Sequence, residues 1–224
     1  MRLSTQKLME RFHKSNFETI VTSLCQKDND LAGIVARHGM PPMWIRPNNF
    51  ATLVLTILEQ QVSIAAAFAA YKKLEAYIGE PTPEKILALS DEELRACYFT
   101  RQKTGYVRGL ATAIQTGAVN LQRYETLADD AVRHELIQLK GIGHWTVDIY
   151  LLHALHRTDI FPIGDIALVN ALKDIKGLDK QTPKETLIEI AEPWRPYRSI
   201  ATMLLWHHYL SKRKPIQDPT SHPL

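Results

Sequence analysis

The stretch Leu139-Lys140-Gly141-Ile142-Gly143-His144-Trp145-Thr146 decides the fold of this chain, because a Gly-x-Gly turn opens there directly onto an apolar segment that reaches about Leu155. Glycine accepts positive φ and lets backbone N–H groups come close to an anion. The first turn of the following helix adds N–H groups without intrahelical partners and the positive end of the helix dipole. We therefore predict a helix-hairpin-helix at about residues 129–156 that binds phosphate, although the same pattern also joins helices in proteins that bind no anion.

A second motif, Phe161-Pro162-Ile163-Gly164-Asp165, places one carboxylate at the start of the next predicted helix. Breaking an N-glycosidic bond builds positive charge on the sugar, and a nearby carboxylate stabilises that charge. Asp165 is therefore the candidate catalytic acid. Aspartate also caps helices, and the two roles can coexist. Asp148, within the second hairpin helix, is another acid, which we interpret as structural. A phosphate clamp beside one acid is the combination that cutting a base from DNA needs.

Together the two motifs resemble those of the helix-hairpin-helix (HhH-GPD) DNA glycosylase superfamily, in its 3-methyladenine DNA glycosylase II (AlkA-like) branch. Members of that branch carry Leu-Pro-Gly-Ile-Gly-x-Trp-Thr-Ala at the hairpin and Phe-Pro-x-x-Asp at the acid. Lys140 stands here in place of the usual proline, and Val147 in place of the usual alanine. The likeness extends from about Phe50 to Trp206 and includes three further matching stretches, at residues 59–63, 100–106 and 194–199.

The resemblance implies an all-α fold with two helical subdomains, the hairpin motif and the active cleft between them, and no N-terminal β-domain. Helical spacing of apolar residues along the chain agrees with this fold class. We expect residues 1–49 to pack with residues 160–210, residues 50–159 to form the central subdomain, and residues 211–224 to form a flexible tail. The apolar run at residues 50–78 predicts one long, enclosed helix.

The implied activity is that of a monofunctional DNA glycosylase, which flips an alkylated purine such as 3-methyladenine or 7-methylguanine out of DNA and hydrolyses its bond to the sugar. Trp145 stands where the endonuclease III-like branch has a lysine that forms a Schiff base, so no lyase activity is expected. Aromatic faces attract cationic bases by stacking and cation–π interaction. The resemblance places Trp145 and Trp206 along the base pocket, where Trp44 closes it and Ile149 replaces a family tyrosine.

The resemblance also implies how the chain contacts DNA. Gln61 occupies the wedge position, where a side chain fills the gap that a flipped base leaves. The full set of expected DNA-binding residues is Gly141, Gly143, Thr146, Lys140, Gln61, Gln60 and Ser63. Arg101 and Lys103 either add backbone contacts or are solvated at the surface. Family hairpins hold a monovalent cation through backbone carbonyls, which map here to Ile137, Leu139 and Ile142, so a structural Na⁺ or K⁺ is the only bound group expected.

Composition also limits which cofactors, metal sites and membrane segments the chain can have. The chain has 224 residues, a net charge of +3 and two cysteines, Cys25 and Cys97, which are too few for the four-thiolate iron–sulfur cluster of the endonuclease III branch. The spacing of the nine histidines supplies no zinc motif. No run approaches the ~20 apolar residues of a membrane span. We expect a monomer that acts on damaged double-stranded DNA, in the cytoplasm with the nucleoid or in a nucleus.

Two alternatives remain open. The chain can be a glycosylase for deaminated bases such as hypoxanthine or uracil, or a non-catalytic helix-hairpin-helix protein that only binds DNA. A pure DNA-binding protein needs the glycines but not Asp165, Trp145 and Gln61 together, so the sequence favours an enzyme.

Overall fold

The computed structural model describes residues 11–212 of the chain. Those residues form thirteen α-helices and one short 3₁₀-helix, and their only β-type pairing is an isolated bridge between Arg11 and Arg157. The all-α prediction is confirmed within this part of the chain. No helix in it combines the length and the apolar composition that crossing a membrane requires.

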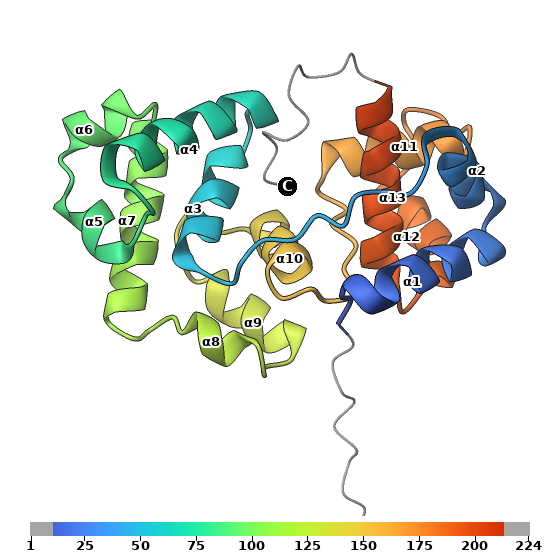
Figure 1. Cartoon of the computed structure of the whole chain (residues 1–224), viewed down its shortest axis with the longest axis horizontal. Coiled ribbons are helices and arrows are strands. Elements are labelled where there is room, and N and C mark those ends of the chain that lie inside the picture. Colours follow the sequence, from blue (N-terminus) through green and yellow to red (C-terminus); the bar gives the residue numbers. More distant parts are fainter. Residues whose placement is uncertain (1–10, 213–224) are drawn as a thin grey trace, which may run out of the picture. The chain divides into compact units, whose positions relative to one another are not determined.

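The described residues divide into two compact units, and Figure 1 shows the helices of each. The first unit contains residues 11–43 and 156–212 and the second contains residues 44–155. The helices of the first unit are α1 (Lys14–Lys27), α2 (Asn29–His38), α11 (Ile166–Ile175), α12 (Lys184–Ala191), η1 (Glu192–Trp194) and α13 (Arg198–Ser211). Those of the second are α3 (Phe50–Glu59), α4 (Ile64–Ile78), α5 (Pro83–Ala88), α6 (Asp91–Ala96), α7 (Arg101–Gln115), α8 (Leu121–Tyr124), α9 (Asp129–Leu136) and α10 (His144–His153).

The tail expected at residues 211–224 lies outside the described residues, except for its first two. Ser211 is the last residue of α13, and Lys212 follows it as the helix cap.

In the first unit, helix α13 is the core element, since every residue from Ser199 to Trp206 is buried. Asp28 links α2 to two other elements of the unit. Its carboxylate accepts hydrogen bonds from the first amides of α2, from Lys176 Nζ at 2.8 Å and from Trp194 Nε1 at 2.8 Å. Burial alone raises the pKa of Asp28, but the hydrogen bonds from Lys176 and Trp194 outweigh it and hold that pKa below its ordinary value.

In the second unit, α3 is enclosed on all sides, because every side chain from Phe50 to Leu58 is buried. The prediction of one helix over residues 50–78 is wrong. The chain leaves the helix after Glu59, Gln61 adopts a φ of 57°, and the Ser63 side chain accepts a hydrogen bond from the amide of Ala66 to begin α4. Apolar composition is similar on both sides of this break, and no glycine or proline marks it, so periodicity alone does not reveal it.

Candidate functional site

The predicted hairpin consists of α9, a turn at residues 137–143, and α10. Within the turn, the amide of Ile142 donates to the carbonyl of Leu139 at 3.0 Å. An ion pair between Arg133 on α9 and Asp148 on α10 ties the two helices together. Asp148 therefore has a structural partner in the neighbouring helix, which agrees with the structural interpretation of this acid.

The two glycines of the turn differ in what requires them. Gly141 has a φ of 89°, and a Cβ there would lie 2.1 Å from Cγ of the Tyr106 ring. Both the backbone conformation and the close packing of that ring therefore exclude a side chain at Gly141. Gly143 has an ordinary φ of −99°, it is exposed, and a Cβ there would meet nothing within 4 Å. Positive φ is thus needed only at the first glycine.

The end of the turn presents backbone donors at an exposed surface. Gly143 is the N-cap residue of α10 and provides no side-chain cap. Its amide and that of His144 donate to no atom within residues 11–212, and both residues are exposed. Lys140 is exposed in the same turn. Amides without partners at the positive end of a helix, together with an ammonium group, suit an anion such as a DNA phosphate.

Gln60 supports this turn from α3. Its Nε2 donates to the carbonyl of Gly141 at 2.8 Å and to Oγ1 of Thr146 at 2.9 Å. Thr146 is only 2% exposed, so its hydroxyl faces Gln60 and not the solvent. Both amide hydrogens of Gln60 are therefore used to hold the hairpin, a positioning role that the sequence does not predict.

The residues after Gln60 form an exposed corner. Gln61, Val62 and Ser63 are exposed, and the Ser63 hydroxyl caps α4. Of the two cations considered for DNA backbone contacts, Arg101 is exposed. Lys103 instead donates from Nζ to the carbonyl of Leu58 at 2.6 Å, where it caps the end of α3, and burial lowers its pKa.

In the first unit, Asp165 is the N-cap residue of α11. Its Oδ1 accepts a hydrogen bond from the amide of Leu168 at 2.8 Å and another from Nε1 of Trp206 at 3.2 Å. Two donors on one oxygen fix the rotation of the carboxylate. Asp165 is only partly buried, and the next residue, Ile166, is 74% exposed. The cap is therefore present, and it orients a carboxylate that is only partly buried.

The residues predicted for the base pocket lie in both units. Trp206 belongs to the first unit with Asp165, and it is 8% exposed. Trp145, Ile149 and Trp44 belong to the second unit, where Trp145 is half-buried and the other two are buried. The carbonyl of Trp44 lies 2.9 Å from Nδ1 of His153, which fixes the backbone before α3.

Metal ligands made of side chains are not assembled in the described part of the chain, where no three His, Cys, Asp or Glu residues lie close enough to bind an ion. Of the three carbonyls considered for a monovalent cation, those of Ile137, Leu139 and Ile142, the carbonyl of Leu139 already accepts the amide of Ile142. The carbonyl of Gly141, which is not one of the three but lies in the same turn, accepts from Gln60.

Residues 54–196 match the family described as HhH-GPD superfamily base excision DNA repair protein. The Bacillus subtilis protein YfjP is 29% identical over 79% of this chain, and the chain spans 64% of the length of YfjP.

Two solved structures are also similar. The Schizosaccharomyces pombe 3-methyladenine DNA glycosylase Mag1, in complex with abasic DNA, is 27% identical with a TM-score of 0.75, and the alignment covers 85% of this chain and 95% of that one. The DNA-3-methyladenine glycosidase of Bacillus halodurans is 30% identical with a TM-score of 0.71, over 90% of this chain and 93% of that one.

Proposed function

Because this chain belongs to the HhH-GPD superfamily of base excision DNA repair proteins, we propose that it is a monofunctional DNA glycosylase that hydrolyses alkylated purines from double-stranded DNA and leaves an abasic site. The activities named for the Mag1 and Bacillus halodurans structures support this choice of substrate. The observation that carries the proposal is the carboxylate of Asp165, fixed in orientation by Leu168 and Trp206 and only partly buried.

In the proposed reaction, the carboxylate of Asp165 faces the sugar of the extruded nucleotide. Its negative charge stabilises the positive charge that develops as the N-glycosidic bond breaks, and it orients the water that attacks the sugar. Alkylated purines carry a positive charge and leave readily, so the enzyme needs to contribute little by protonating the leaving base. An indole offers such a base stacking at roughly 1–3 kcal/mol per contact, and Trp206, which donates to Asp165, lies in the same unit as that acid.

The hairpin binds the DNA backbone in this proposal. The amides of Gly143 and His144 donate to one phosphate, and Lys140 adds charge beside it. Gln61, at the exposed corner after α3, fills the gap left by the extruded base. We expect the protein to act as a monomer, in the compartment that holds the chromosomal DNA.

The structural ion remains part of the proposal. The carbonyls of Ile137, Leu139 and Ile142 would hold Na⁺ or K⁺ at the hairpin, and the ion would add positive charge near the bound phosphate. Affinity for abasic-site DNA in KCl or NaCl should then exceed that in N-methylglucamine chloride of equal ionic strength. Equal affinity in all three salts would remove the ion from the proposal.

Asp165→Asn tests the proposed function. Asparagine is nearly isosteric and still caps the helix, but it removes the charge. Base release from methylated DNA should fall by about 100-fold or more, while affinity for abasic-site DNA stays unchanged. Asp130→Asn, which removes an exposed carboxylate on α9, is the matched control and should act like the parent. Rapid release by Asp165→Asn would show that this carboxylate is not catalytic.

Two further measurements define the reaction. Oligomers with hypoxanthine or uracil, treated in parallel with methylated DNA, show whether deaminated bases are released. Release of hypoxanthine or uracil in place of the alkylated purine would replace the proposed substrate class. Borohydride added during turnover traps any Schiff base. No covalent protein–DNA adduct is expected, because Trp145 offers no amine at the lyase position, and a strong adduct would overturn the monofunctional assignment.

A further inference from the structure

Three residues of the segment Arg157–Ile160, which leads toward Asp165, are hydrogen-bonded by Ser199 of α13. The amide of Ser199 donates to the carbonyl of Thr158 at 2.9 Å, and the Ser199 hydroxyl donates to the carbonyl of Arg157 at 2.6 Å. The amide of Ile160 donates in turn to the Ser199 hydroxyl at 2.8 Å. Ser199 is completely buried, so water cannot replace these hydrogen bonds.

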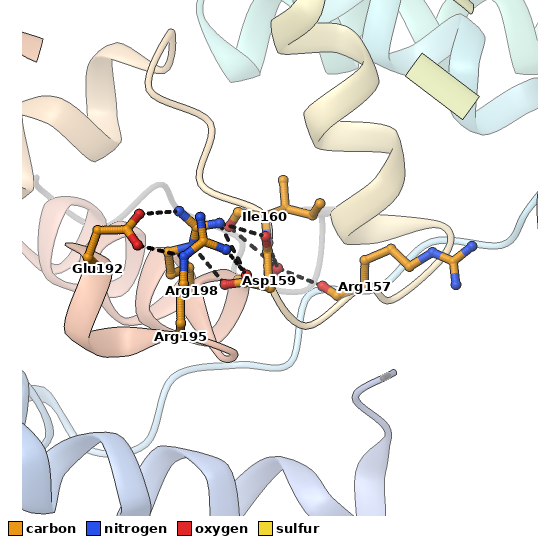
Figure 2. Close-up of polar contacts among 7 residues, drawn as sticks. Arg157, Asp159, Ile160, Glu192, Arg195 and Arg198 are labelled. Atoms are coloured by element: carbon orange, nitrogen blue, oxygen red, sulfur yellow. Dashed lines mark hydrogen bonds and ion pairs between the residues drawn. The ribbon is translucent and has the colours of Figure 1, made fainter. Parts of the chain in front are cut away.

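The remaining residue of the segment, Asp159, is held by two arginines. Its carboxylate accepts from Arg198 Nε at 2.7 Å and from Arg195 Nη1 at 2.5 Å. Figure 2 shows Glu192 and Asp159 on opposite sides of the two guanidinium groups, and Glu192 accepts from Arg195 Nε at 2.7 Å. Hydrogen bonds between ionised partners are the strong ones, and the side chain of Arg198 is only 12% exposed.

The same helix therefore binds the chain before and at the candidate catalytic acid. Ser199, in the first turn of α13, holds residues 157–160, and Trp206, two turns later, donates to Asp165. The four residues between Ile160 and Asp165 are also constrained. The amide of Asp165 donates to the carbonyl of Pro162 at 2.8 Å, and the ring of Phe161 lies edge-on to Trp194 with 6.3 Å between centroids.

We propose that Ser199 and Asp159 are positioning residues for Asp165, which act by fixing the segment Arg157–Ile160 on α13. This inference rests on the proposed function, in which Asp165 is the catalytic acid. Neither residue touches the base or the sugar. Each sets where the carboxylate stands, and a misplacement of about 1 Å in a catalytic group can cost on the order of 100-fold in rate.

Ser199→Ala removes one buried hydroxyl and leaves the amide of Ile160 without its acceptor. We expect single-turnover base release at saturating enzyme to slow by roughly 10- to 100-fold, with unchanged affinity for abasic-site DNA. Thr202→Val is the matched control. Thr202 is buried on the same helix, its hydroxyl has no hydrogen-bond partner within residues 11–212, and the change should leave the rate unaltered.

Combination with Asp165→Asn separates positioning from a general loss of structure. When the carboxylate is absent, its placement no longer matters, so Ser199→Ala should not slow the Asp165→Asn enzyme further. The same fold-loss in both backgrounds would overturn the inference, because Ser199 would then act independently of Asp165. If circular dichroism shows that Ser199→Ala is unfolded, Asp159→Asn, at a partly exposed position, replaces it in the same cycle.

The two proposals fail in different ways. Parental base release by Asp165→Asn would contradict the proposed function itself. Slow release by Asp165→Asn together with parental release by folded Ser199→Ala would leave the proposed function intact and contradict only the positioning role.

Discussion

Replacement of Gly141 by alanine should destabilise the protein, because two independent features of the turn exclude a Cβ there. An L-residue at a φ of 89° costs about 1–2 kcal/mol. The new methyl group would also lie 2.1 Å from the Tyr106 ring, which must move, and overpacking of this kind costs about 1–3 kcal/mol. The free energy of unfolding should thus fall by about 2–5 kcal/mol.

Gly143→Ala is the matched comparison, since it adds the same methyl group to the same turn in open space at a φ of −99°. Its free energy of unfolding, from urea titration followed by circular dichroism, should stay within about 0.5 kcal/mol of the parent. Its affinity for abasic-site DNA, from fluorescence anisotropy at several salt concentrations, should fall about equally for all flanking sequences, because phosphate contacts carry no sequence information.

A second-site change isolates the contact with the ring. Tyr106→Ala removes the ring atoms that the new methyl group would meet. In that background, Gly141→Ala should lower the free energy of unfolding by less, and the difference should equal the part of the loss that comes from overpacking. If Gly141→Ala unfolds at the parental urea concentration, the packing argument is refuted. If Gly143→Ala binds DNA as tightly as the parent, the hairpin is not the phosphate site.

Three further outcomes are expected. Gln60→Glu cannot donate to the carbonyl of Gly141, so it should lower both DNA affinity and the free energy of unfolding, the latter by about 1–3 kcal/mol; parental values for both would contradict the supporting role. The pKa of Asp28 lies below 3.8 in the folded protein, so its ionised carboxylate stabilises the parent at pH 7, and this contribution is lost as pH falls below about 4. Asp28→Asn should therefore lower the free energy of unfolding at pH 7 and reduce the further loss of stability in acid. An unchanged dependence of urea unfolding on acid pH would refute this. Burial, and then the neighbouring histidines, lower the pKa of His38 below 6.5, so the unfolded state binds its proton first and stability should fall as pH drops below 6.5; His38→Gln should reduce that slope, and an identical slope would contradict it.

The features that were predictable from sequence are those whose chemistry is local. The Gly-x-Gly turn and the cap at Asp165 each depend on residues within a few positions, so the hairpin and the start of α11 could be placed by inspection. Helical periodicity likewise predicted the all-α class. The break at Gln60–Ser63 is different, because its only local signal is a serine cap within a continuous apolar run.

The features that could not be predicted join residues far apart in the chain. Gln60 binds the hairpin across 81 positions, and the Tyr106 ring fills the space beside Gly141 although the two residues lie on different elements. The binding of residues 157–160 by Ser199 spans about 40 positions. Such contacts arise from packing, and a single sequence carries no periodicity that reports them.

The two hydrogen bonds accepted by one oxygen of Asp165 affect how members of this family can diverge. One carboxylate oxygen serves both the helix cap and the indole of Trp206, and the amide oxygen of an asparagine could serve both equally well. Aspartate and asparagine codons differ by a single nucleotide. One base change can thus silence the proposed chemistry while the fold and the DNA-binding hairpin persist, so a descendant that binds damaged DNA without cutting it lies one mutational step away. A relative of this chain with asparagine at the equivalent position should be read first as a folded DNA-binding protein, and not as a decayed gene product.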